Sequence, residues 1–205
     1  GRGGVSKHSG GSSYFYFGPG NDTVFSFVLH DGSNAYSPNG HTYSSEWTHY
    51  AGVYNKSNDT MSLYVNGTLH DQADVSSMGT ISNEDFTLGR RGPTAFFDGK
   101  IDDVRVYDRA LSESEIQDIY NDTNHTVVNA SQNDRVTDGL VGMWSFNGSD
   151  LSGAVAADVS GSGNNGSLVL QQKSGGEDGL DTSLGSAEWH SVPLDSSYYR
   201  HSPLV

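Results

Sequence analysis

Hydrophobic and polar residues alternate along much of the first 120 positions, with the period of two that is typical of strands having one buried face. Turn-forming residues separate these alternating segments, and Asn66-Gly67 is the strongest two-residue hairpin signal in the chain. Short strands at this spacing predict an all-β, antiparallel β-sandwich. The predicted strands cover residues 13–17, 23–29, 47–54, 60–65, 68–75 and 100–107.

The alternation slips once, at the pair Asp102 and Asp103 in the last of these strands. The flanking residues Ile101, Val104 and Val106 keep the apolar pattern. Two explanations fit the slip: a β-bulge, or two carboxylates that point toward a cation.

One helix is predicted, directly after this strand, near residues 112–120. Ser112 is a suitable N-cap, and Glu115 three positions later can complete a capping box. Leu111 and Ile116 are spaced for a hydrophobic staple across the same helix start.

These segments resemble a known family. DGKIDDVRVYDRALSESEIQDIY (98–120) resembles the last strand and closing helix of the laminin-G-like, concanavalin A-like jelly rolls of large secreted and surface proteins. The segments at 46–75 and 81–92 are similar to the family's central hairpin and the short piece after it. The resemblance covers most of residues 1–120 and implies the later two-thirds of such a jelly roll.

The rest of the chain divides in two. Residues 121–139 carry closely spaced sequons and few apolar groups, which predicts a glycosylated linker. Residues 140–205 begin with an aromatic pair, Trp144 and Phe146, and continue with an Asp-x-Ser-Gly-x-Gly-x-x-Gly run. Both features resemble the opening third of the same jelly roll, and residues 189–193 resemble its next core strand.

The order of the two segments is therefore the reverse of the family's order. The chain can be a piece of a tandem array, a circular permutant, or a subunit whose tail completes the next subunit in a head-to-tail filament. Each segment alone would expose an apolar face and unpaired strand edges, so we expect the two to pair, within a chain or between chains.

Composition limits the classes of partner. The chain of 205 residues has a formal net charge of −14, which makes nucleic acid an unlikely partner. It has no cysteine, and no apolar run approaches the roughly 18 residues that a membrane span needs.

Asparagine usage indicates export. Nine of the 14 asparagines begin an Asn-x-Ser/Thr sequon, where chance would give about three. Some of the excess follows from the preference of Asn, Ser and Thr for turns. We expect an extracellular or cell-surface glycoprotein, with these acceptor sites: Asn21, Asn55, Asn58, Asn66, Asn121, Asn124, Asn129, Asn147 and Asn165.

The family resemblance implies a structural Ca²⁺ ion where the opening loop meets the final strand. Calcium prefers several oxygen ligands, often carboxylates together with carbonyls of a Gly/Asn-rich loop. The resemblance points to Asp158, a carbonyl near Gly163 or Asn164, and a carboxylate of Asp102 or Asp103. The alternative is that Asp158 caps a turn and that the other two carboxylates face solvent or pair with Arg105.

Catalysis is not expected. The chain lacks the clustered carboxylate pattern that glucan-cleaving jelly rolls use, and it has no metal-binding histidine pair or nucleophile elbow. The sequence thus predicts a calcium-stabilised structural or adhesive glycoprotein, foremost a self-assembling surface filament whose partners are copies of itself. The alternative is a carbohydrate- or protein-binding module of a larger adhesin, with ring contacts from loop tyrosines such as Tyr36, Tyr43, Tyr198 and Tyr199.

Overall fold

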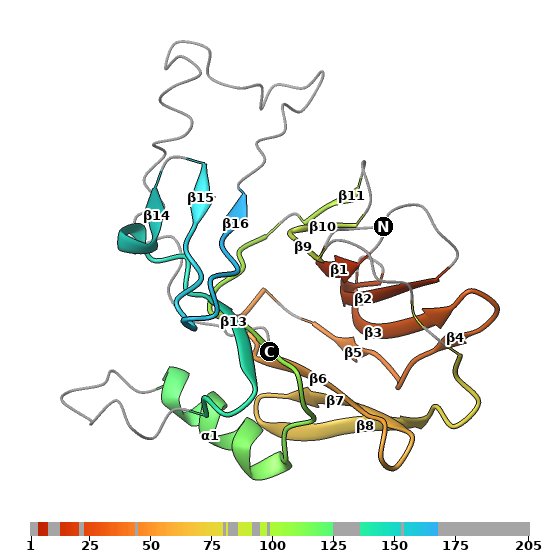
Figure 1. Ribbon diagram of the computed structural model, residues 1–205. Helices are drawn as coiled ribbons and strands as arrows, with labels where there is room; N and C mark the ends of the chain where they lie inside the picture. Colours follow the sequence, from red (N-terminus) through yellow and green to blue (C-terminus); the bar gives the residue numbers. More distant parts are fainter. Residues whose placement is uncertain are drawn as a thin grey trace.

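Over the residues that it describes, the computed structural model is mostly β-sheet with one α-helix, as the hydrophobic pattern predicts (Figure 1). It describes residues 4–7, 13–20, 23–43, 45–79, 81, 86–91, 95–97, 99–124, 136–152 and 154–167.

The first layer is a six-stranded antiparallel sheet with the order β4-β3-β2-β1-β9, in which β5 also pairs with β3. Its strands are β1 (Val5–Lys7), β2 (Ser13–Pro19), β3 (Val24–Asp31), β4 (Ala35–Tyr36), β5 (His41–Thr42) and β9 (Phe86–Leu88).

The second layer is the three-stranded meander β6-β7-β8, and smaller sheets complete the fold. The meander comprises β6 (Tyr50–Asn55), β7 (Thr60–Val65) and β8 (Thr68–Asp74). The smaller sheets comprise β10 (Arg90–Arg91) with β11 (Ala95–Phe96), β12 (Val104–Tyr107) with β13 (Leu140–Trp144), and β14 (Leu151–Ser152) with β15 (Val155–Ala156) and β16 (Gly166–Ser167). A 3-10 turn, η2 (Gly148–Asp150), precedes β14.

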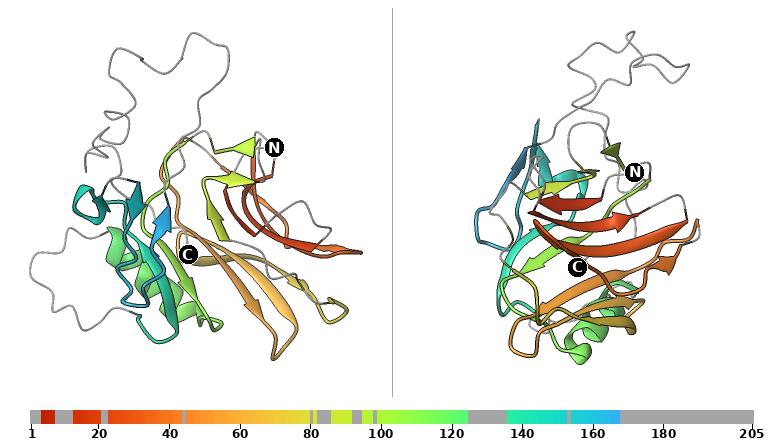
Figure 2. Two further views of the ribbon diagram at one scale, coloured as in Figure 1. Left: turned by 45° about the horizontal axis from the view of Figure 1, so that its top comes forward. Right: turned by 90° about the vertical axis from the view of Figure 1, so that its right-hand side faces the viewer.

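The main core lies between the two layers, as Figure 2 shows in its right-hand view. Inward-facing residues of β2 and β3 pack against Met61 and Leu63 of β7, both fully buried. One aromatic contact crosses this space: Phe25 of β3 stacks on Tyr50 of β6 with ring centroids 3.7 Å apart. Within the first layer, Phe17 of β2 meets Phe27 of β3 edge-on at 5.6 Å. Because large apolar side chains dominate this contact, its burial is the main source of stability for the sandwich.

The outer face of the meander is covered by the helix α1 (Glu113–Asn124), which makes a third layer (Figure 2). Ala51 and Tyr64 face away from the main core and pack with Leu111, Ile116 and Ile119. The meander is therefore buried on both faces, which explains why four consecutive residues of β7 are buried.

The helix start has the predicted capping box. The amide of Glu115 donates to Ser112 Oγ at 3.3 Å, and the amide of Ser112 donates to Glu115 Oε2 at 2.8 Å. Leu111 and Ile116 are buried in one cluster, as a hydrophobic staple requires. The helix continues to Asn124, so residues 121–124 are helical where the sequence pattern predicts linker.

The predicted hairpin turn is also present. Asn66 and Gly67 both have positive φ, +49° and +77°, which is the conformation of a type I′ turn. This turn joins β7 to β8, whose register pairs Val65 with Thr68.

Three differences from the sequence pattern have a tertiary cause. β1 lies outside the predicted strands; it is short, but it lies between β2 and β9 and forms backbone hydrogen bonds with both. The predicted strand at 47–54 starts only at Tyr50. β4 and β5 also lie outside the predicted strands, and they pair with β3 at its two ends.

The slip at the Asp pair is a backbone irregularity. Asp103 has a φ of +48°, so the strand pattern breaks there and β12 begins only at Val104. Asp102 is 5% exposed, and its Oδ1 accepts a hydrogen bond from the amide of Asp103 at 3.0 Å.

In the part of the chain that the structure describes, no helix has the length and apolar character needed to cross a bilayer.

Candidate metal site at the junction of the two segments

The junction, by which we mean β12, β13 and the loop 158–165, is where the tail of the chain meets the head. β13 pairs antiparallel with β12, with Val104 opposite Trp144 and Val106 opposite Gly142. Val104 and Trp144 belong to the main core cluster, and Ile101 and Phe146 pack against it. In this structure the tail therefore contributes to the same core as the head, within one chain.

The loop 158–165 is organised by the carboxylate of Asp158. Its Oδ1 accepts hydrogen bonds from the amides of Met143 and Ser160, both at 2.9 Å, and its Oδ2 accepts one from the amide of Asn164 at 2.8 Å. The amide of Asp158 in turn donates to Asn165 Oδ1 at 3.0 Å. One side chain thus fixes the loop on itself and on the edge of β13.

This hydrogen bonding sets the charge state of Asp158. Partial burial raises the pKa of the carboxyl, but the hydrogen bonds from Ser160, Met143 and Asn164 favour the ionised form more strongly. The pKa of Asp158 therefore lies below its ordinary value of 3.8. A carboxylate with this pKa is available to a cation at neutral pH.

The loop carbonyls predicted as calcium ligands are those near Gly163 and Asn164, and one of them already accepts a hydrogen bond. The Asn164 carbonyl accepts a hydrogen bond from Trp144 Nε1 at 3.2 Å, and Asn164 Nδ2 donates to the Val141 carbonyl at 2.6 Å. Gly163 has a φ of +79° and is exposed. Oxygen atoms of the loop are thus close to Asp158 along the chain, as a calcium loop requires.

The other two nominated carboxylates lie elsewhere. On one edge of β13, the amide of Met143 donates to Asp158 Oδ1 and the carbonyl of Met143 accepts from the amide of Val159. The opposite edge of β13 pairs with β12. Asp102 and Asp103 precede β12, which pairs with the edge of β13 opposite to the one that contacts Asp158. The described residues contain no group of three or more His, Cys, Asp or Glu side chains placed to hold a metal ion. Asp158, Gly163 and Asn164 belong to one loop, Asp102 and Asp103 belong to another segment, and the calcium ion with its ligands stays a prediction.

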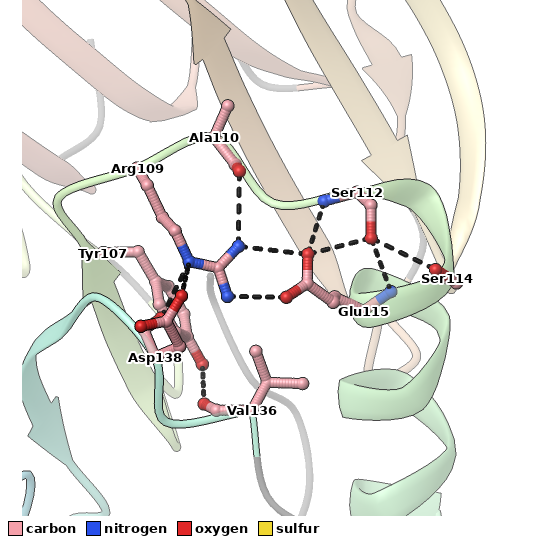
Figure 3. A network of polar contacts seen from close by, with 8 residues as sticks. All are labelled: Tyr107, Arg109, Ala110, Ser112, Ser114, Glu115, Val136 and Asp138. Atoms are coloured by element: carbon pink, nitrogen blue, oxygen red, sulfur yellow. Dashed lines mark hydrogen bonds and ion pairs between the residues drawn. The ribbon is translucent and has the colours of Figure 1, made fainter.

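A polar network fixes the point where the tail re-enters the fold, and Figure 3 shows its members. Arg109 forms a two-pronged contact with Glu115, with Nη–Oε distances of 3.1 and 2.5 Å, and its Nε donates to the Asp138 carbonyl at 3.0 Å. The Tyr107 hydroxyl donates to the Val136 carbonyl at 2.9 Å. The network therefore joins the end of β12, the start of α1 and residues 136–138.

Glu115 is the centre of this network. Its hydrogen bond with Arg109 and that with the Ser112 amide lower the pKa of the Glu115 carboxyl to about 2. Glu115 was predictable as a cap from its spacing to Ser112. Arg109 and Asp138 were not, because 29 positions separate them and no local pattern connects them.

The acceptor asparagines differ in what their side chains contact. Asn58 is exposed and its Oδ1 accepts from the hydroxyl of its own sequon Thr60 at 2.7 Å. By contrast, Asn66 Oδ1 accepts from the amide of His49 at 3.0 Å, and Asn165 Oδ1 accepts from Asp158.

The other sequons are less informative. Asn121 and Asn147 are exposed, and Asn55 Oδ1 accepts from the amide of Ser57. Asn124 lies in α1, but its side chain is outside the described part, as are Asn21, Asn129 and the predicted strand at 189–193. Glycosylation of any of them stays a prediction.

The loop tyrosines that could stack on a sugar have another role in the structure. Tyr36 and Tyr43 are half-buried and pack against the main core. Tyr36 also donates toward Asp31 Oδ2 at 3.4 Å and lies 3.2 Å from Ser77 Oγ. They cover the core, and Tyr198 and Tyr199 lie outside the described residues.

Comparison with known families agrees with the sequence pattern. The laminin G family model described as "Concanavalin A-like lectin/glucanases superfamily" matches residues 2–117, more than half of the chain. The matched range ends within α1, so the tail lies outside it.

Individual relatives are distant. The chain is 29% identical over 111 residues to "Botulinum-like toxin eBoNT/J" of Enterococcus sp. (strain 3G1_DIV0629), a match over 48% of this chain and only 8% of that protein. A solved S-layer domain-containing protein (residues 221-444) from Clostridium thermocellum ATCC 27405 is 24% identical, with 56% of this chain and 59% of that chain covered. Its TM-score is 0.29, and we infer nothing about assembly from it.

Proposed function

Because the chain belongs to the concanavalin A-like lectin/glucanases superfamily, we propose that it is a non-catalytic structural or adhesive module of the cell surface. The sequon count supports export, and the exposed side chains of Asn58, Asn121 and Asn147 are accessible for glycan attachment. The acidic surface suits a soluble extracellular protein.

The observation that carries this proposal is the pairing of β13 with β12. The head alone would leave Val104 and the apolar residues around it open, and β13 covers them with Trp144. A module whose later segment completes its core can close on itself. It can equally complete a neighbouring copy, because an exchanged segment forms the same contacts between chains.

We propose that this exchange builds head-to-tail filaments. The described contacts of the tail are with β12, with the core and with the Arg109 network, and each of these surfaces is present on every copy.

Light scattering coupled to size-exclusion chromatography tests the assembly, with the full chain loaded over a hundredfold range of concentration. Exchange predicts a mass that rises with concentration and threads in electron micrographs without any added ligand. A constant monomer mass at every concentration would reject the filament and leave the closed module. A monomer that also binds specific sugars on a glycan array would favour the carbohydrate-binding alternative.

We further propose that calcium stabilises the junction through the loop 158–165. The ionised Asp158 and the neighbouring loop oxygens support a hard cation there. Melting of the full chain with calcium and with chelator tests this. Calcium should raise the melting temperature of the wild type, and should raise that of Asp158→Asn and of Asp102→Asn less or not at all. Identical melting temperatures of the wild type in both buffers would contradict the calcium proposal.

A further inference from the structure

The layer between α1 and the outer face of the meander contains two buried polar side chains that the proposed function does not use. His49 precedes β6 and is 2% exposed, and Arg105 lies in β12 and is 7% exposed. Both ring nitrogens of His49 and Nε of Arg105 are buried without a hydrogen-bond partner among the described residues. Since buried polar atoms are nearly always hydrogen-bonded, three orphaned atoms indicate a missing partner.

Strand alternation places both side chains in this layer. Tyr50 packs in the main core and Ala51 under the helix, so His49 shares the helix-facing side with Ala51. Val104 likewise packs in the main core and Tyr107 under the helix, so Arg105 faces the helix layer. The ring of Tyr120, from α1, lies 5.7 Å from that of His49.

The layer also holds an uncompensated positive charge. Among the described residues no carboxylate forms an ion pair with Arg105, whereas Lys56 and Arg109 each have one. Two carboxylates act on tyrosines of this layer: Glu113 on Tyr64 and Glu115 on Tyr107. Burying a cation without a counter-charge is costly.

We propose that His49 and Arg105 bind a small inorganic anion, of the size of chloride, between α1 and the sheet. An anion accepts hydrogen bonds from the guanidinium Nε–H and from an imidazole N–H, and it neutralises Arg105. A water molecule could accept the same hydrogen bonds but would leave the charge unbalanced. The positive charge of Arg105 opposes the binding of a metal cation to the His49 imidazole.

The choice of salts separates site binding from general screening. The chain carries a net charge of −14, so raising the concentration of any salt will stabilise it somewhat. Sodium gluconate at the same ionic strength screens equally, but its anion is too large for a buried site. The difference in melting temperature between sodium chloride and sodium gluconate is therefore the signal.

For the full chain we expect chloride at tenfold its Kd to raise the melting temperature by about 3–6 °C over gluconate. The variants Arg105→Met and His49→Phe should lose this difference. Lys56→Met removes an exposed cation with one ion pair, 3.1 Å from Asp59, and should keep it. Equal melting of the wild type in the two salts would overturn the proposal, as would an unchanged chloride effect in Arg105→Met.

A second measurement avoids dependence on the folding of the variants. Wild-type crystals soaked in sodium bromide should show an anomalous peak within hydrogen-bonding distance of Arg105 Nε. Density without an anomalous signal at that position would identify water and overturn the anion.

Discussion

At the scale of single residues, burial decides the chemistry of His49. Burial and the charge of Arg105 lower the pKa of its imidazole from the ordinary 6.5 to about 3. In the unfolded chain the same imidazole is protonated below about pH 6.5, whereas the folded protein excludes the proton until about pH 3. The folded state is therefore favoured above pH 6.5 and loses stability as the pH falls through this window.

This gives a pH prediction for chloride-free buffer. Between pH 6.5 and 4.5 the free energy of unfolding should fall with a slope that approaches about 1.4 kcal/mol per pH unit for this one group. Urea unfolding at several pH values measures the slope, and His49→Phe should flatten it.

His41 provides the comparison for this measurement. Its pKa is also lowered, by burial and by the charge of His70, so it contributes in the same window. His41→Gln should flatten the slope less than His49→Phe, because His41 is only half-buried. An equal slope in the wild type and in His49→Phe would contradict the assignment. Asp31, Glu115 and Asp158 have lowered pKa values and add their effect only below about pH 4.5.

At the scale of elements, the β7–β8 turn is built into the packing of the helix. Gly67 has a φ of +77°, and a Cβ added there would lie 3.0 Å from the ring of Tyr120. Gly89 has a similar φ of +73°, but a Cβ there would meet nothing within 4 Å. Both glycines therefore have a positive φ, but only Gly67 has a side chain close to the position of an added Cβ.

We therefore predict that Gly67→Ala destabilises the protein more than Gly89→Ala. The backbone conformation should cost each variant about 1–2 kcal/mol. Gly67→Ala should cost about 1 kcal/mol more, since Tyr120 must shift from its place beside His49. Chemical denaturation of both variants measures the difference, and equal losses would show that the turn does not support the helix.

Elements whose determinants are local were predictable from the sequence. The capping box at Ser112 and Glu115 and the turn at Asn66 need only residues a few positions apart, and both are present. β1 was missed because three residues form a strand there only with β2 and β9 on its two sides. The slip at Asp102 was ambiguous, because a carboxylate in an irregular strand suits both a bulge and a ligand.

The candidate site shows the same limit. Asp158 in a Gly/Asn-rich loop satisfies the pattern of a calcium ligand and equally that of a residue that caps amides, and three amides do donate to it. The layer around His49 had no sequence signal at all. Burial of His49 depends on α1, whose Tyr120 is 71 positions away along the chain.

At the scale of the whole molecule, the junction explains how two segments in reversed order can belong to one sandwich: β13 of the tail pairs with β12 of the head. The family pattern alone could not decide which surface the tail completes, because pairing over this sequence separation depends on tertiary contact. The register of β13 on β12, with Trp144 in the shared core, shows one way in which the two segments form a single sandwich.

A chain that ends at Asn124 tests this dependence. Without the tail, β12 lacks β13 and the core lacks Trp144 and Ala156, so we expect exposed apolar surface, dye binding and aggregation. In the full chain, Trp144→Ala should reduce the free energy of unfolding by about 3–5 kcal/mol. Val155→Ala, at a side chain that is 41% exposed, is the control and should have little effect.

Adding a peptide of residues 136–167 to the truncated chain extends the test to assembly. If the junction forms between separate chains, the peptide should restore a cooperative melting transition, and the Trp144→Ala peptide should not. Rescue in trans would show that the contact that closes one copy can join two, which is the physical requirement for head-to-tail exchange. A truncated chain that melts like the full chain without any peptide would mean that the head is already complete, and exchange would then have no driving force.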